Sequence, residues 1–272
     1  MKNKFYIIAT PIGNLNEISK RAIDAFNEVS TFFSEDTRVT KKLLKHLEIN
    51  YSNKTFLIAN SYTDNIDPFV IIEALKKGNC ALVSDSGYPL ISDPGFGLWK
   101  VFNQLRIMPE IINGPSAVLH SLVLSGLSTN NFFFQGFLSN NNASRQKQLE
   151  AISKIKGTII VFEGVHKILK TLDKFHEFFG DIEICIVKEL TKINETKYQG
   201  KISKIINEID LRGEFVILFE NNPQKALNDN LILQEIDRLV KSGTRIKDAC
   251  KIVAYKYDLK ANQLFEKYGS GI

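Results

Sequence analysis

Short apolar runs alternate with amphipathic helical patterns through the first ~125 residues of this 272-residue chain. Each run has the length and the polar or turn-forming boundaries that are typical of a buried strand. Strands and helices in this order favour a mostly parallel sheet covered by helices on both faces. The expected strands are Phe5–Ala9, Thr31–Ser34, Thr55–Ala59, Cys80–Ser84 and Glu110–Ile112, and the expected helices are Ser19–Asn27, Thr40–Leu47, Pro68–Lys77, Phe96–Leu105 and Ser116–Ser125.

A second group of strands is expected beyond a polar linker at residues 126–131. These strands are Thr158–Glu163, Ile182–Lys188, Glu195–Gly200 and Glu214–Glu220. Only a short helical pattern separates the last two, so this sheet is expected to be mixed. From about Leu231 the pattern is purely helical. We therefore predict an α/β fold with domains at residues 1–126 and 127–228, followed by a helical tail at residues 229–272.

The composition of the chain indicates which kinds of partner and which cellular location to expect. The formal net charge of +5 and the pI near 8.9 are compatible with an anionic partner. Cys80, Cys185 and Cys250 are far apart and have no paired spacing, which indicates reduced thiols, a cytoplasmic location, and neither a disulfide framework nor a metal site. No apolar run approaches the ~20 residues that a membrane-spanning helix needs, so no membrane partner is expected.

The loop Ser84–Gly95 holds two glycines, two prolines, two aspartates and three serines between a strand and a helix. Loops at the carboxyl ends of strands carry the ligands of open α/β sheets. The chain has neither a Walker loop nor the spaced glycines of a dinucleotide site, which disfavours a phosphate cradle. The sequence favours a ligand held by backbone and apolar contacts, such as an adenosine without phosphates. Other polar segments follow expected strands at Thr10–Leu15, Glu35–Arg38, Asn113–Ala117, Phe162–Lys167 and Lys188–Lys192.

Five segments occur in an order that resembles one known family. They are Ala9–Leu15, Glu35–Arg38, Ser84–Gly95, Gly114–Ala117 and Arg212–Phe215, spread over more than 200 residues. Together they resemble the ribosomal RNA small-subunit methyltransferase I family of the tetrapyrrole methylase superfamily. The resemblance implies two α/β domains with a cleft between them and a small C-terminal helical extension. It also implies a homodimer that uses S-adenosylmethionine to methylate the 2′-hydroxyl of a cytidine in the decoding region of 16S ribosomal RNA, with that RNA or the 30S subunit as partner.

The resemblance further implies which residues contact S-adenosylmethionine. The segment Gly87–Ile91 aligns with the superfamily's Gly-Asp-Pro loop, and Tyr88 stands in the place of its acidic residue. Segments at the ends of other strands supply the remaining contacts. The implied contacts are Pro11, Ile12, Gly87, Tyr88, Ile91, Ser116, Ala117, Phe162 and Leu190.

Methyl transfer to a ribose hydroxyl is an in-line displacement that positioning accelerates, and a base that takes the hydroxyl proton adds roughly 10²–10⁴-fold. Glu35 and Asp36 are candidates for this base because they end a strand beside the expected crevice. The alternative is that they cap the following helix or pair with Arg38. Glu189 and Glu163 are further candidates.

Basic residues near the same loops are candidates for contacts with RNA phosphates. Arg145 and Lys147 follow an uncharged polar segment, Ser139–Ser144, which we expect to order on RNA. Arg38 and Lys167 complete the expected RNA-binding set. The alternative is that all four are ordinary surface charges. The helical tail, as a helix-turn-helix, either touches nucleic acid or simply packs.

Three classes of function follow. The basic charge, the segment Glu35–Arg38 and the helical tail favour an RNA methyltransferase. The shared fold also permits a small-molecule methylase of the tetrapyrrole type. The third class is a non-catalytic RNA-binding member, in which the bulky Tyr88 fills the cofactor site. Binding of S-adenosylmethionine separates this third class from the first two.

Overall fold

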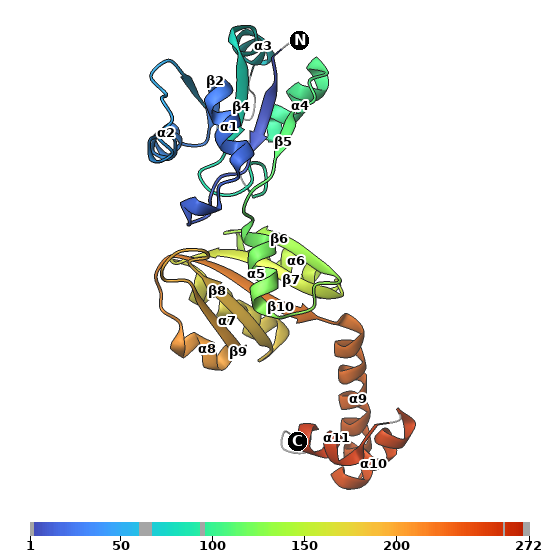
Figure 1. The fold of residues 1–272 in the computed structure, drawn as a ribbon. Helices are drawn as coiled ribbons and strands as arrows, with labels where there is room; N and C mark the ends of the chain where they lie inside the picture. The colour runs from blue at the N-terminus through green and yellow to red at the C-terminus, as the bar shows by residue number, and fades with distance from the viewer. Residues whose placement is uncertain (1–2, 60–66, 93–95, 258, 269–272) are drawn as a thin grey trace.

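The N-terminal half folds around one parallel sheet (Figure 1). The computed structural model describes residues 3–59, 67–92, 96–257 and 259–268. The strands of the first sheet are β1 (Phe5–Ile8), β2 (Val29–Ser34), β3 (Thr55–Ile58), β4 (Asn79–Val83) and β5 (Glu110–Ile112). Their order is β3-β2-β4-β1-β5, and each neighbouring pair is parallel. The prediction of a mostly parallel sheet with these five strands is confirmed.

Helices cover both faces of this sheet, because successive side chains of a strand point to opposite faces. The helices are α1 (Lys20–Glu28), α2 (Thr37–His46), α3 (Pro68–Lys77) and α4 (Phe96–Leu105). Phe5 and Ile7 of β1 pack in a cluster to which α3 and α4 contribute. Tyr6 and Ile8 pack on the other face, against α1 and α2. The predicted cover on both faces is therefore confirmed.

The second sheet is mixed, as the sequence predicts. Its strands are β6 (Phe132–Phe137), β7 (Gly157–Gly164), β8 (Glu183–Lys188), β9 (Thr196–Lys201) and β10 (Glu214–Asn221). The order is β6-β7-β10-β8-β9, in which β6 and β7 are parallel and the other pairs are antiparallel. As a consequence, β10 begins at the edge of the sheet where β7 and β8 end.

Helices also cover both faces of the second sheet (Figure 1). They are α5 (Ala117–Ser125) on one face and α6 (Asn142–Ser153), α7 (Ile168–Phe179) and α8 (Ile202–Glu208) on the other. Val118 and Leu122 of α5 pack against Cys185, Val187 and Leu218. Although α5 precedes the expected domain boundary at residue 126, its packing groups it with the second sheet. The boundaries themselves remain a prediction.

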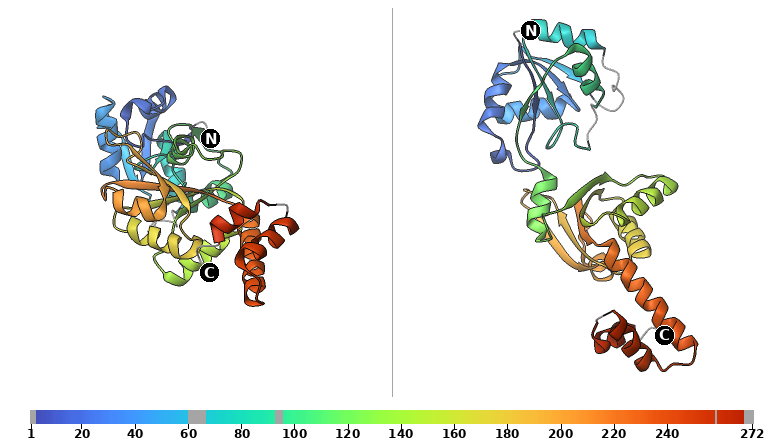
Figure 2. Two further views of the ribbon diagram at one scale, coloured as in Figure 1. Left: turned by 90° about the horizontal axis from the view of Figure 1, so that it is seen from below. Right: turned by 90° about the vertical axis from the view of Figure 1, so that its right-hand side faces the viewer.

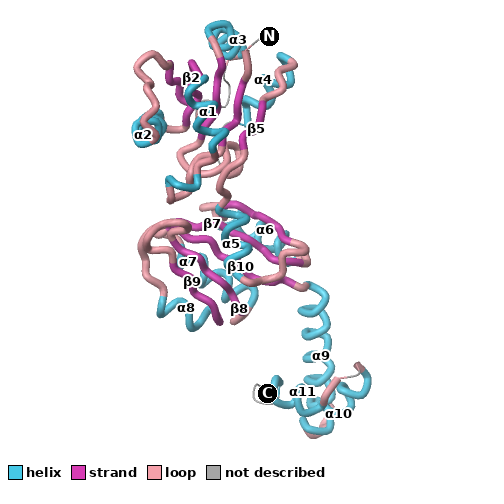
Figure 3. Tube along the Cα trace, viewed as in Figure 1, coloured by secondary structure: helices cyan, strands magenta, loops and turns pink. Residues whose placement is uncertain are grey.

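After β10, the regular elements of the described residues are all helices (Figure 3). They are α9 (Pro223–Lys241), α10 (Ile246–Lys256) and α11 (Ala261–Tyr268). The helical tail is confirmed, although α9 begins at Pro223 and not near Leu231. Within the described residues, no helix combines the length and the apolar character that crossing a membrane requires.

Candidate cofactor-binding site

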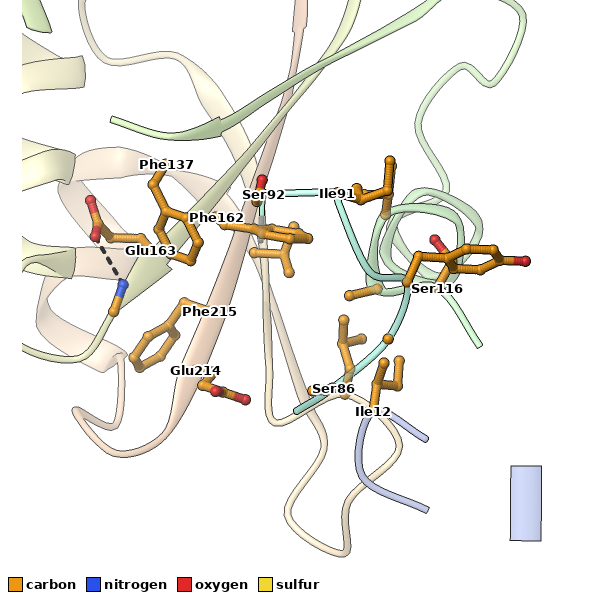
Figure 4. A pocket seen from close by; sticks show the side chains of 17 residues that line it. Ile12, Ser86, Ile91, Ser92, Ser116, Phe137, Phe162, Glu163, Glu214 and Phe215 are labelled. Atoms are coloured by element: carbon orange, nitrogen blue, oxygen red, sulfur yellow. Dashed lines mark hydrogen bonds between the residues drawn. The ribbon is translucent and has the colours of Figure 1, made fainter. Parts of the chain in front are cut away.

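A cavity of about 320 Å³ lies where loops of the first sheet meet α5 and one edge of the second sheet (Figure 4). It brings together eight of the nine residues expected to contact the cofactor, all but Pro11. Most of the lining is apolar. The lining residues are Ile12, Ser86, Gly87, Tyr88, Ile91, Ser92, Ser116, Ala117, Val118, Phe137, Phe162, Glu163, Gly164, Leu190, Glu214, Phe215 and Val216.

The loop after β4 forms one wall and is fastened to the loop after β1. The backbone N–H of Thr10 donates to the carbonyl of Gly87 at 2.9 Å, and the N–H of Gly87 donates back to Thr10 at 3.2 Å. Gly87 has φ +76°, and a Cβ there would lie 3.3 Å from the Ile12 side chain. Leu90 and Ser92 also have positive φ, of 74° and 65°. Non-glycine residues in this region are strained and cluster at ligand sites. The expected segment 93–95 of this loop lies outside the described residues.

Tyr88 is tied to the loop that follows β5. Its hydroxyl donates to Asn113 Oδ1 at 3.3 Å and accepts from the backbone N–H of Gly114 at 3.2 Å. The ring therefore lines the cavity while its polar end is held at the neighbouring loop, and the cavity remains open beside it. In this arrangement the Tyr88 ring does not fill the cavity. The structure therefore does not support the alternative in which this side chain blocks the cofactor site.

The second sheet contributes residues that the sequence did not single out for the site. Among them are Glu214, Phe215 and Val216, at the start of β10. Glu214 pairs with Gly164 at the end of β7, and Phe215 pairs with Lys188 at the end of β8. From the sequence, ligand contacts are expected at the carboxyl ends of strands. These residues fall outside that expectation because β10 is antiparallel to β7 and β8, so its amino end lies where those two strands end. The signal that could have found them is the segment Arg212–Phe215, which carries part of the family resemblance.

Aromatic rings make part of the cavity wall apolar. Phe137 and Phe162 line it with ring centroids 5.7 Å apart, and Phe134 packs edge-on against Phe162 at 4.7 Å. Phe215 is almost fully buried beside them. Such faces suit a flat heteroaromatic ligand.

Glu163 is buried and both of its carboxylate oxygens are occupied. Oε1 accepts from the backbone N–H of Gly164 at 2.9 Å, the dashed line in Figure 4. Oε2 accepts from the Thr171 hydroxyl at 2.6 Å. These bonds satisfy a charge that would otherwise be costly to bury, so Glu163 positions the loop after β7.

Glu189, one of the expected bases, lies behind the cavity wall. Its Oε1 accepts from Lys192 Nζ at 3.0 Å and from the backbone N–H of Glu214 at 3.1 Å. Burial opposes its charge, but the bonds from Lys192 and Glu214 outweigh that effect and lower the pKa of Glu189. Glu189 does not line the cavity. Its geometry is that of a carboxylate that supports Lys192 and the start of β10.

Glu35 and Asp36 also stand outside the cavity lining. Asp36 is the N-cap of α2, accepts from the backbone N–H of Arg38 at 2.8 Å and pairs with the Arg38 guanidinium at 2.6 Å. These hydrogen bonds from Arg38 lower the pKa of Asp36 to about 2. A carboxylate of such low pKa is a weak proton acceptor at neutral pH. Asp36 therefore caps α2 and pairs with Arg38, as the alternative to a catalytic base supposed.

The four expected RNA-binding residues differ in their surroundings. Arg38 is exposed but paired with Asp36, and Lys147 and Lys167 are exposed. Arg145 is buried in α6, and its guanidinium donates to the carbonyls of Ser139 and Asn140 at 2.9 and 3.2 Å. These bonds hold the polar segment before α6 in place and give Arg145 a structural role, while its contact with RNA stays a prediction.

Comparisons with known proteins agree with this fold. The family model of the tetrapyrrole (corrin/porphyrin) methylases matches residues 4–206. Diphthine synthase has a similar fold, with a TM-score of 0.60 at 14% identity over 80% of this chain and 90% of that chain. The uroporphyrin-III-C-methyltransferase of Thermus thermophilus has a TM-score of 0.56 at 13% identity over 80% and 94%.

Sequence relatives extend the match to the tail. The ribosomal RNA small subunit methyltransferase I of Mycoplasma pneumoniae is 40% identical over 95% of this chain and 96% of its own length. That of Bacillus subtilis is 35% identical over 97% and 93%. This chain belongs to the ribosomal RNA small subunit methyltransferase I family, within the tetrapyrrole (corrin/porphyrin) methylases.

Proposed function

We propose that this protein methylates small-subunit ribosomal RNA with S-adenosylmethionine as donor, at the 2′-hydroxyl of a cytidine in the decoding region. The observation that carries the proposal is the cavity, which unites eight of the nine residues that the family resemblance implies for the cofactor. Full-length relatives named for methylation of this RNA support the substrate class.

The lining suits a nucleoside that carries a positive charge. The volume of about 320 Å³ lies within the usual range of small-molecule sites. Phe137 and Phe162 offer apolar faces for the adenine, and Glu214 offers negative charge at the cavity edge. When bound, S-adenosylmethionine supplies a methyl group on a cationic sulfur that is open to in-line attack.

Positioning is the main contribution that this proposal assigns to the protein. Holding a ribose oxygen in line with the methyl carbon can supply up to ~7–11 kcal/mol of the barrier reduction. Of the four carboxylates considered as bases, Glu35, Asp36 and Glu189 do not line the cavity, and Glu163 lines it with both of its oxygens already hydrogen-bonded. The proposal therefore assigns the role of base to no side chain. We also propose that the protein is a homodimer, as the resemblance implies, and that it is cytoplasmic, as the reduced cysteines indicate. Light scattering tests the homodimeric state.

Two measurements test the proposal. Calorimetry should show that S-adenosylmethionine binds the purified protein, and absence of binding at millimolar cofactor contradicts any methyltransferase function. Isolated small subunits that lack the modification should then become methylated, and reverse-transcription stops at low nucleotide concentration should fall at one cytidine. Methylation elsewhere in the RNA corrects the nucleotide, and methylation of a tetrapyrrole alone overturns the RNA assignment.

A further inference from the structure

The helices α10 and α11 form a small unit that stands away from the cavity. Figures 1 and 2 show α9 carrying this unit beyond the second sheet. Among the described residues, those of its apolar core all belong to the tail, including Ile236, Cys250, Val253 and Leu264. A separate core of this kind keeps the unit folded while its outer faces remain available to a partner.

This unit holds much of the chain's excess positive charge. Residues 245–268 contain six basic and three acidic side chains, hence a net charge of +3, against +5 for all 272 residues. A concentration of positive charge on a projecting unit favours an anionic partner.

One face of α10 combines this charge with an exposed aromatic ring. Lys247, Lys251 and Tyr255 follow one another at intervals of four residues, so they span an arc of about 80° on the helix. Tyr255 is 93% exposed. Lys251 pairs with Asp248 at 3.3 Å, but both side chains are more than half exposed, and such a pair contributes little in water. Lys247 Nζ lies 5.3 Å from the Phe265 ring centroid.

Lysines beside an exposed tyrosine match the chemistry of unpaired RNA. Phosphates meet the lysines, and a splayed base stacks on the aromatic ring. A protein partner would need a broader apolar area than the three lysine and tyrosine positions of this face offer, although Ile252, Tyr257 and Leu259 nearby are also partly exposed.

We propose that the α10 face formed by Lys247, Lys251 and Tyr255 binds unpaired nucleotides of the substrate RNA. This inference rests on the proposed function and adds a docking surface outside the cavity. The tail then anchors the RNA while the cavity acts on a different nucleotide.

The test uses the full-length chain and isolated small subunits. The double variant Lys247→Gln/Lys251→Gln should weaken binding about tenfold at moderate salt and reduce the slope of log affinity against log salt by roughly 1.4–1.8, for two lost phosphate contacts. Tyr255→Ala should weaken binding roughly 5- to 150-fold, and Tyr255→Phe should retain it, because stacking needs only the ring. Photo-crosslinking through position 255 should label RNA.

A matched control lies on α7. Lys170 and Lys174 are also four residues apart on a helix, and Lys174 pairs with Glu177 as Lys251 pairs with Asp248. Lys170→Gln/Lys174→Gln should bind subunits with the affinity and salt slope of the wild type. Calorimetric affinity for S-adenosylmethionine should be the same in every variant, which shows that the fold and cavity are intact.

Each other outcome has a distinct meaning. If the wild type methylates subunits and either Lys247→Gln/Lys251→Gln or Tyr255→Ala binds them normally, the proposed docking surface is overturned and the proposed function stands. Crosslinking of position 255 to a ribosomal protein also overturns it. If the wild type binds S-adenosylmethionine but neither binds nor methylates subunits, the proposed function fails and the inference fails with it.

Discussion

Glu163 and Glu214 are acidic residues of the cavity lining that differ in what they can do. Glu163 is buried with both oxygens bonded inside its own domain. Glu214 has a largely exposed side chain that accepts from Lys192 Nζ at 3.2 Å and reaches the cavity edge. The sequence shows two glutamates at strand ends and cannot rank them, because the difference depends on partners that are distant in the chain.

Glu214→Gln should lower the affinity for S-adenosylmethionine about fivefold. An exposed carboxylate is screened by water, so its attraction to the cationic ligand is of the order of 1 kcal/mol. S-Adenosylhomocysteine, whose sulfur is neutral, should lose less affinity. Calorimetry of both ligands measures the difference. Glu220→Gln, at the far end of the same strand, is the control. Equal affinities of wild type and Glu214→Gln for both ligands would show that this carboxylate does not face the ligand.

Gly213→Ala should destabilise the protein more than Gly180→Ala. Both glycines have positive φ, of 87° and 78°, so alanine is strained at either position. A Cβ at Gly213 would also collide with the Glu189 carboxylate, whereas nothing lies within 4 Å of one at Gly180. We expect a loss of about 1 kcal/mol at Gly180 and a further ~1–3 kcal/mol at Gly213. Urea unfolding measures both, and equal losses would mean that Glu189 moves aside freely.

The elements that build the cavity are the loops after β1, β4 and β8, the first turn of α5, the end of β6 and the paired ends of β7 and β10. The helix α5 begins at the cavity because the Ser116 hydroxyl caps it, accepting from the backbone N–H of Leu119 at 3.4 Å. The pattern from Ser116 to Ser125 predicted this helix correctly. That it packs on the second sheet depends on contacts between Val118, Leu122 and strands that lie more than 60 residues away.

Ser116→Ala should cost about 1 kcal/mol of stability and also weaken cofactor binding, because the first turn of α5 is part of the cavity wall. Ser19→Ala is the matched control. The Ser19 hydroxyl caps α1 through an equivalent bond to Ala22 N at 3.1 Å, and Ser19 does not line the cavity. Thermal unfolding should show similar losses for both variants, and calorimetry should show weaker S-adenosylmethionine binding for Ser116→Ala alone. If Ser116→Ala binds S-adenosylmethionine as tightly as the wild type, the helix cap at Ser116 does not contribute to the cofactor site.

On the scale of the whole molecule, the cavity belongs to both α/β units. Ile12 packs in the same apolar cluster as Leu190 and Val216 of the second sheet. The backbone N–H of Asn14 donates to Thr191 Oγ1 at 3.0 Å across the same junction. A Cβ on Gly13 would meet Thr191 and Lys192 within 2.8 Å, so glycine permits this close approach. A ligand in the cavity therefore touches residues from both units at once.

S-Adenosylmethionine should stabilise both α/β units together. At 100 times the dissociation constant, binding to the folded state alone contributes about 2.7 kcal/mol. Scanning calorimetry with and without ligand should show that every transition of the α/β units moves upward. A shift confined to one transition, with the other unchanged, would mean that the ligand is held by one unit.

The amino-acid sequence by itself determined the strands other than β6, most helices and the parallel order of the first half, and it predicted the loop Ser84–Gly95 as a ligand wall. These features depend on local periodicity and turn-forming residues, which a sequence displays directly. Only the tertiary structure decided that Glu214 and Phe215 join the cavity, that Arg145 is buried and that Tyr88 turns toward Asn113. The physical reason is that antiparallel pairing, burial and side-chain hydrogen bonds join residues that are remote in sequence, and no local pattern records which partner each will meet.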